Sequence, residues 1–453
     1  MLMRIILIIV TFNLLTIPPT NIYVISFGSN IKLNKTPAHV PSILPPNTIA
    51  ISPRLYYYNH YTDPSLSMPL AFVRVDVLNS TSGEPLKDIN GNPSTNILTD
   101  ANGNFTFGPI YAPRGCWVNL KIYSRNDAAI VVDPGREIID PYSRQMEIPE
   151  FVSVGENKTI TYTYLDTEHS QNIAEFVHPW TILSYHSGVT RGWCYIFDET
   201  DSIIPQAIVR YPNQTGPFYD FTTEEIVLPW GVEPFPDVIL HEYAHSVMNM
   251  CYGYFPPVML KHSIEKKSNL TTAWVEGWAD SFPLPVFNRT TLKSFPYGEV
   301  YDLEVPTWCW SQYGWEDGDE VEGRVAGALQ DIFDSHNDGN DTFSDGFSRI
   351  WNIMQTQPSN TFRGFWQAWN TSGYQKQPAL MAIFQNTIDY RGKGDVDADG
   401  NVTILDQIIL AKAFGFKKGD SKFDKRADLN YDDTVNILDA IIFANYFGKH
   451  YDC

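Results

Sequence analysis

Two histidines four residues apart, with a glutamate directly after the first, constrain this chain more than any other feature. They stand in the stretch Pro236-Asp-Val-Ile-Leu-His241-Glu242-Tyr-Ala-His245. On a helix, residues i and i+4 share one face about 6 Å apart, so His241 and His245 can turn their rings toward one metal ion. Glu242 projects about 100° further round, close to that ion without having to ligate it. The pattern therefore predicts a zinc-binding helix, although short motifs of this kind also occur by chance.

A second predicted helix, residues 271–280, supplies acidic residues at the same spacing. Glu276 and Asp280 are four residues apart, and Trp274 and Trp278 stand beside them. Carboxylates among bulky apolar residues are costly to bury unless a cation pairs with them, which argues against a merely solvated acidic face. One of the two carboxylates can bind zinc while the other accepts a hydrogen bond from a ligating histidine.

The two motifs together resemble the gluzincin metallopeptidases, the thermolysin-like group. Residues 322–334 are similar to the helix that follows the zinc site in secreted members. The resemblance implies a mainly helical catalytic domain with a small upstream sheet. Strands are predicted at 207–211 and 225–228, and the resemblance places an extended substrate along 225–228. His178 and His186 are predicted to be structural rather than metal ligands.

The same resemblance implies roles for the residues of both motifs. Zinc would be held by His241, His245 and Glu276, and Asp280 would orient a ligating histidine. Glu242 would take a proton from a zinc-bound water as that water attacks the carbonyl of a peptide or protein substrate. A further donor to the oxyanion is expected. The downstream candidates for this donor are Tyr301, Tyr313, Arg324 and His336.

Two acidic loops near the C-terminus form another motif. Each places side-chain oxygens at loop positions 1, 3, 5, 7 and 12, the pattern of a calcium-binding loop. The predicted calcium ligands are Asp395, Asp397, Asp399, Asn401 and Asp406 in the first loop, and Asp428, Asn430, Asp432, Thr434 and Asp439 in the second. The second loop has Asp433 where the first has Gly400. A left-handed residue other than glycine costs about 1 kcal/mol there, so weaker calcium binding is expected.

The arrangement of these loops resembles a dockerin, an all-α module with paired EF-hand-like loops. Each loop ends in Ile-Leu-Asp, carries Asp rather than Glu at position 12, and precedes one apolar helix, predicted at 408–414 and 440–447. The resemblance implies docking onto a cohesin-type scaffold protein. Ile404-Leu405 and Ile437-Leu438 stand at the positions that select the partner. The alternative is that they pack the two halves of the module together.

Upstream of the zinc motif, apolar and polar residues alternate with the period of two that is typical of strands. Strands are predicted at 72–78, 104–107, 117–123 and 158–164, with Asn- and Gly-containing turns between them. This pattern predicts an antiparallel β-sandwich, similar to the transthyretin-like regulatory domains of carboxypeptidases. The sandwich could be a binding module, a spacer or a removable pro-segment.

The predicted fold class is therefore multidomain α+β. The predicted parts are a signal peptide at 1–28, an extended segment at 29–65, the sandwich at 66–165, the zinc metallopeptidase domain at 166–390 and the dockerin-like calcium-binding domain at 391–453. The apolar run of the signal peptide, Ile5 to Leu15, is too short for a membrane span, and we expect no other span.

The net charge and the glycosylation motifs indicate which partners and which location to expect for this protein. The formal net charge of −20 argues against a nucleic-acid partner. Asn-x-Ser/Thr triplets recur, as at Asn79, Asn104 and Asn213, which favours an exported glycoprotein, secreted or associated with the cell surface. The alternative to a peptidase is a non-catalytic extracellular scaffold or adhesion component that retains the fold; the intact Glu242 argues against it. A carbohydrate-active enzyme is a third hypothesis, supported by the dockerin-like tail alone.

Overall fold

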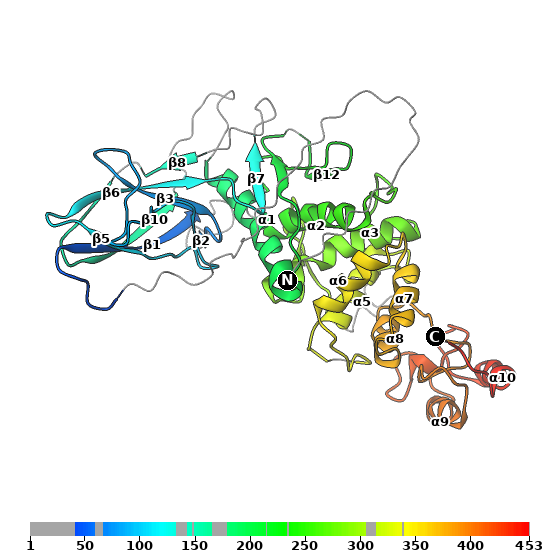
Figure 1. The fold of residues 1–453 in the computed structure, drawn as a ribbon. Helices are drawn as coiled ribbons and strands as arrows, with labels where there is room; N and C mark the ends of the chain where they lie inside the picture. The colour runs from blue at the N-terminus through cyan, green and yellow to red at the C-terminus, as the bar shows by residue number, and fades with distance from the viewer. Residues whose placement is uncertain are drawn as a thin grey trace, which may run out of the picture. The chain divides into compact units, whose positions relative to one another are not determined.

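The structure is a computed structural model that describes residues 41–58, 67–132, 143–146, 149–164, 179–213, 215–232, 235–304, 314–337 and 339–452. These residues form a mixed α/β structure with several small sheets (Figure 1). The predicted signal peptide, His178 and Tyr313 lie outside the described residues. No helix within the described ranges is both long enough and apolar enough to cross a membrane.

Two sheets in the first part of the chain enclose one hydrophobic core. The first sheet consists of β1 (Thr48–Tyr58), β2 (Ser67–Pro69), β5 (Phe107–Tyr111) and β10 (Asn157–Tyr164). The second consists of β3 (Arg74–Asn79), β4 (Ile97–Leu98), β6 (Cys116–Tyr123), β8 (Ser143–Gln145) and β9 (Glu150–Val152). Ile51 and Ile160 from one sheet and Val75 and Leu120 from the other are buried in the same cluster.

The strands of this region follow the predicted pattern with three differences. β3, β6 and β10 lie where strands are predicted, whereas the strand predicted at 104–107 is replaced by β5, which begins only at Phe107. β1 lies inside the segment 29–65, which the sequence predicts as an extended lead-in. β1 also pairs in parallel with β10, as Ala50 opposite Asn157 shows, whereas antiparallel pairing was expected throughout. The proline and polar residues of β1 hide its alternation, although Ile49, Ile51 and Leu55 are buried.

A small sheet connects this region to the helices. Its strand order is β12 (Phe218–Asp220), β13 (Glu225–Val227), β11 (Ala207–Arg210) and β7 (Ala129–Val132). β7 comes from the range 66–165 and yet pairs in parallel with β11. All four of its residues are buried, as expected of a strand covered on both faces. Helix α1 (Pro179–Thr200) packs against β7 and buries His186 completely.

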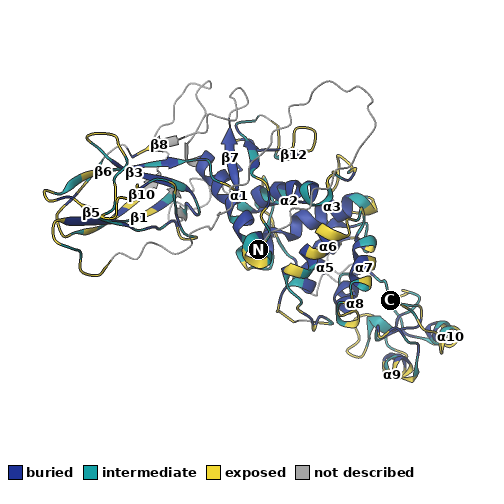
Figure 2. Ribbon diagram, in the orientation of Figure 1, coloured by how far each residue is buried: buried dark blue, intermediate teal, exposed yellow. Residues whose placement is uncertain are grey.

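Helices α2 (Pro236–Tyr252), α3 (Leu270–Ser281) and α5 (Glu322–Phe333) form the centre of the helical part. α3 packs against both of the others, and all three are largely buried (Figure 2). A Cβ atom on Gly277 would lie 2.7 Å from the Val325 side chain, so α3 and α5 approach closely only because this residue is glycine. The remaining elements are α4 (Pro283–Phe287), β14 (Thr291–Lys293), β15 (Val300–Asp302), α6 (Phe347–Thr356), α7 (Phe362–Thr371) and α8 (Gln377–Gln385).

The C-terminal residues form two similar halves. They contain α9 (Ile404–Ala413), the 3-10 helix η3 (Lys425–Ala427) and α10 (Ile437–Tyr446). The halves exchange equivalent hydrogen bonds: Val402 N–H donates to the carbonyl of Lys449 at 2.9 Å, and Val435 N–H to that of Phe416 at 2.9 Å. Both helices begin earlier than predicted, because Thr403 with Asp406, and Asn436 with Asp439, form capping boxes.

Candidate metal centre

A proline and a glycine set the two ends of α2. Pro236 occupies the first turn, and Gly253 ends the helix with φ of 71°, its N–H bonded to the carbonyl of Asn249 at 2.8 Å. Asp237 in the first turn is buried, accepts a hydrogen bond from Lys293 N–H at 2.8 Å and pairs with Arg289. These contacts fix the helix that carries His241, Glu242 and His245.

Helix α3 carries the acidic pair, and its start differs from expectation. The sequence predicts a helix from residue 271, whereas α3 begins at Leu270, because the side chain of Asn269 caps it by accepting a hydrogen bond from Thr272 N–H at 2.8 Å. The helix ends at Ser281, immediately before Pro283 begins α4. Glu276 and Asp280 are both buried on α3, so their burial demands a compensating positive group.

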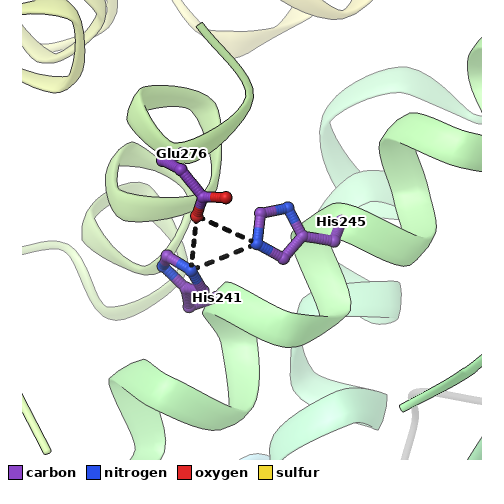
Figure 3. Close-up of side chains that lie close together, drawn as sticks. All are labelled: His241, His245 and Glu276. Atoms are coloured by element: carbon purple, nitrogen blue, oxygen red, sulfur yellow. Dashed lines mark hydrogen bonds and ion pairs between the residues drawn. The ribbon is translucent and has the colours of Figure 1, made fainter. Parts of the chain in front are cut away.

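The structure brings His241, His245 and Glu276 together around one point (Figure 3). Nε2 of His241 lies 3.2 Å from Nε2 of His245, and each of these atoms lies 3.2 Å from Oε2 of Glu276. Three atoms bound to one zinc ion at 2.0–2.1 Å with tetrahedral angles are separated by about 3.3 Å. The three side chains therefore fit a zinc ion in both donor type and spacing.

Asp280 lies on the far side of the first histidine. Its Oδ1 is 2.9 Å from Nδ1 of His241. A proton on Nδ1 shared with this carboxylate leaves the lone pair of Nε2 directed at the three-atom cluster. His245 lacks an equivalent carboxylate: its buried Nδ1 has no hydrogen-bond partner among the described residues.

The protonation states of the cluster are strongly coupled. Burial lowers the pKa of His241, but hydrogen bonds to Asp280 and Glu276 outweigh burial and raise this pKa well above its ordinary value. Burial raises the pKa of Glu276, but the two histidines outweigh it and hold this pKa well below its ordinary value. The carboxylates of Glu276 and Asp280 thus keep a proton, and its positive charge, on His241 between them. A zinc ion would take the place of that proton.

Glu242 lies beside the cluster without joining it. It is 6% exposed, and burial raises its pKa, opposed by the charges of His241 and His245. The backbone N–H of Tyr219 on β12 also hydrogen-bonds this carboxylate. A carboxylate whose pKa is raised toward neutrality is suited to accept and return a proton.

The strand next to this carboxylate differs from the strand expected. The resemblance places an extended substrate along 225–228, but β13 is an inner strand, paired with β11 on one side and β12 on the other. Among the described residues, β12 and β7 are the two outer strands of this sheet, and β12 packs against α2. The sequence gives no sign of β12, because three residues are too few to establish a period.

His262 and Glu322 complete the surroundings of the cluster, and sequence analysis missed both. Nδ1 of His262 lies 2.8 Å from Oε2 of Glu322, and its Nε2 lies 3.8 Å from Oε1 of Glu276. The side chain of His262 is 31% exposed, whereas Glu322 is buried. His262 stands in the connection between α2 and α3, where no periodic pattern identifies it; only the folded chain brings it to the cluster.

The four residues predicted as candidate donors to the oxyanion have different surroundings in the structure. Arg324 is buried, and its guanidinium donates to the carbonyl of Glu316 at 3.1 Å and lies over the ring of Trp315. The hydroxyl of Tyr301 donates to Oε2 of Glu299 at 2.7 Å. The N–H of His336 donates to Asp334 in a turn. Tyr313 lies outside the described residues.

The first acidic loop gathers its carboxylates. Asp395, Asp397 and Asp399 place oxygens within 4.8 Å of one another. Asp395 is buried, and burial is the largest cause that raises its pKa to about 7. Repulsion from the carboxylates of Asp406, Asp397 and Asp399 raises this pKa further, whereas the hydrogen bond from Gly400 N–H lowers it. Three carboxylates this close are stabilised by a cation, and calcium takes oxygen ligands of this kind. Asn401 completes the predicted ligand set at position 7.

The second loop repeats the backbone of the first. Oδ1 of Asp439 accepts from the N–H groups of Leu429 and Asn430, as Asp406 does in the first loop. Asp433 has φ of 62° and Gly400 has φ of 85°, so the left-handed conformation expected at this position is present in both loops. The remaining predicted ligands, Asp428, Asp432 and Thr434, occupy the equivalent positions.

Two pairs of apolar residues at the start of α9 and α10 are exposed. Ile404 and Leu405 on one helix, and Ile437 and Leu438 on the other, each have more than half of their surface accessible. Yellow segments on both helices show the same exposure (Figure 2). They do not belong to the core that Val396, Val435 and Phe443 form between the halves.

Comparison with known families gives two matches. Residues 190–387 match the model of the mycolysin C-terminal domain, a range that contains His241, Glu242, His245 and Glu276. Residues 393–448 match the model of the dockerin type I domain. The two matches support a thermolysin-like metallopeptidase with a dockerin. Both domains are typical of extracellular or cell-surface proteins.

Whole-chain comparisons add little. No curated protein matches the chain. Among solved structures, it is similar to GBS52, the minor pilin of Streptococcus agalactiae, with 13% identity over 26% of this chain and 44% of the pilin chain and a TM-score of 0.17. The chain thus spans less than half of that pilin, and the likeness carries no argument about fold or function.

Proposed function

We propose that this protein is an exported zinc-dependent peptidase that attaches to a partner through its dockerin-like module. The observation that carries this proposal is the triangle of Nε2, Nε2 and Oε2 atoms, 3.2 Å on each side, beside a buried glutamate. His241, His245 and Glu276 are the proposed ligands, and Asp280 is the residue that orients His241. When bound, zinc supplies Lewis acidity and lowers the pKa of a water molecule to near neutrality.

Glu242 is the proposed general base and acid. Its carboxylate takes the proton from the attacking water and returns it to the leaving amine. The raised pKa of Glu242 supports this role, because it makes the carboxylate a stronger base that takes the proton of the water more readily. Tyr219 N–H keeps the carboxylate beside the ligand histidines throughout.

β12 is the proposed edge along which the substrate lies. Its outer side offers backbone groups that can pair with an extended peptide, and Tyr219 connects it to Glu242. His262 is the proposed donor to the oxyanion. It is the partly exposed side chain whose Nε2 approaches the ligand carboxylate, and Glu322 holds its ring from the other side.

The dockerin-like module is proposed to bind calcium and a cohesin-type scaffold protein. The exposed pairs Ile404-Leu405 and Ile437-Leu438 support this partner, because apolar residues excluded from the core favour an apolar contact surface. The substrate itself is a peptide or protein.

Hydrolysis of a mixed peptide library tests the catalytic proposal. Wild type and Glu242→Gln are compared with Glu199→Gln, a control on an exposed glutamate of α1, and the zinc content of each is measured. We expect about one zinc per chain in all three and cleavage by all except Glu242→Gln. Zinc binding with no cleavage by any of them would favour the alternative, a scaffold or adhesion component that keeps the fold without the reaction.

A further inference from the structure

The two calcium loops have nearly the same backbone, so any difference between them lies in their side chains. In the first loop, Asp395 accepts hydrogen bonds from Asp399 N–H at 3.1 Å and Gly400 N–H at 3.0 Å. In the second, Asp428 accepts from Asp432 N–H at 3.1 Å and Asp433 N–H at 3.0 Å. Both leading aspartates are completely buried. Each loop therefore buries a carboxylate that needs positive charge nearby.

The second loop already contains such a charge. The ammonium of Lys425 lies 2.7 Å from Oδ2 of Asp428 and 3.1 Å from Oδ1 of Asp433. Its side chain is only 13% exposed, so solvent screens this contact poorly. The first loop has Gly392 and Gly400 at the positions equivalent to Lys425 and Asp433. Neither half of this lysine–aspartate contact thus has a counterpart there.

The side chains that could bind calcium also favour the first loop over the second. The first loop offers the carboxylates of Asp395, Asp397, Asp399 and Asp406, whereas position 3 of the second loop is an amide, Asn430. The amide nitrogen of Asn430 donates to Oδ2 of Asp432 at 2.9 Å, and this bond occupies an oxygen that a calcium ion would need. Fewer negative ligands lower the affinity of such a loop for calcium.

We propose that the ammonium of Lys425 is the resident cation of the second loop, so that the module binds one calcium ion tightly, in the first loop. Calcium bound to Asp428 would have to share this carboxylate with the ammonium of Lys425, and two cations at so short a range repel strongly in a buried site. Calcium can enter the second loop only after the lysine leaves it. The second loop and α10 are consequently stabilised without calcium, whereas the first loop depends on it.

Calcium stoichiometry tests this proposal and is independent of peptide hydrolysis. The zinc-saturated full chain is stripped of calcium and titrated with ⁴⁵Ca²⁺ in equilibrium dialysis. Asp395→Asn is expected to remove the tightest calcium ion, whereas Asp428→Asn leaves it in place. Lys425→Met keeps an unbranched side chain that is one atom shorter, and it removes the charge. This variant is expected to increase the calcium affinity of the second loop by about tenfold or more and to reveal one additional bound ion.

A matched control and two contrary outcomes define the test. Lys418→Met removes an ammonium that is 44% exposed and 3.6 Å from Oδ2 of Asp433, and it should leave the stoichiometry unchanged. If wild type binds two tight ions, one lost in Asp395→Asn and the other in Asp428→Asn, the lysine is not the resident cation. An unchanged titration of Lys425→Met would overturn the proposal equally. Even if Lys425→Met does not fold, the two aspartate variants show whether a second tight ion occupies the loop of Asp428, which would overturn the proposal.

Discussion

Nδ1 of His262 lies 2.8 Å from Oε2 of Glu322, a contact that joins the connection between α2 and α3 to the first residue of α5. The hydrogen bond to Glu322 raises the pKa of His262 to about 9, and burial raises the pKa of Glu322 to about 7. Near neutral pH the pair therefore holds a proton on the imidazole, beside the proposed ligand carboxylate of Glu276. The imidazole is kept as a donor, which is the property required by its proposed role.

His262→Gln is expected to lower kcat by about 10²–10³-fold with a smaller change in KM, because a donor to the oxyanion acts mainly in the transition state. The measurement is steady-state peptide hydrolysis together with zinc content. His450→Gln, a substitution of an exposed histidine in the C-terminal module, serves as control and should behave like wild type. Loss of zinc, or a raised KM at unchanged kcat, would contradict the assignment.

Asp280→Asn is expected to weaken zinc binding by about 10–100-fold, because an amide orients His241 without supplying negative charge. The measurement is competition for zinc with a chelator of known affinity. Glu199→Gln again provides the control for loss of one carboxylate. If Asp280→Asn kept all of its zinc under competition, the 2.9 Å contact between Asp280 and His241 would not affect how strongly His241 binds zinc.

Zinc affinity is expected to rise with pH through neutrality. The pKa of His241 is raised well above its ordinary value, so the metal-free cluster keeps its proton at pH 7 and must release it when zinc binds. Affinity then increases by up to about tenfold per pH unit until the proton is lost without zinc. Calorimetric titration at several pH values, in buffers of different ionisation enthalpy, counts the proton released. An affinity that does not vary between pH 6 and 8 would contradict this.

His186→Phe is expected to reduce the sensitivity of the fold to acid. Burial lowers the pKa of His186 from 6.5 to about 3. The unfolded chain therefore binds one more proton between these values, and the stability present above pH 6.5 falls as the pH decreases toward 3. The slope attributable to this residue is about 1.4 kcal/mol per pH unit. Urea unfolding of both proteins from pH 7 to pH 4 measures it, because the difference between them isolates His186.

The sequence predicts the metal cluster better than its surroundings. His241, Glu242 and His245 lie on one helix, and Glu276 and Asp280 on another, so the period of 3.6 residues already places them on shared faces. Pro236 in the first turn and Gly253 after the last turn mark the ends of α2. Such local rules apply within one element and do not depend on distant contacts.

The residues that sequence analysis missed depend on contacts between distant segments. His262 and Glu322 are 60 residues apart, and they meet where α5 lies close against α3, an approach that Gly277 permits. β12 is a strand only because it pairs with β13, and β1 only because β10 and β5 flank it. No periodicity in three residues, or in a strand interrupted by proline, could reveal such pairings.

The pairing of β7 with β11 restricts where this chain can be divided into fragments that fold. A fragment that starts at residue 166 would lack β7 and leave the edge of β11 open, and an open strand edge promotes aggregation. A recombinant catalytic fragment must therefore carry residues 129–132 with it. Because β7 comes from the range predicted as the sandwich, the sandwich and the helical part cannot be exchanged as independent modules.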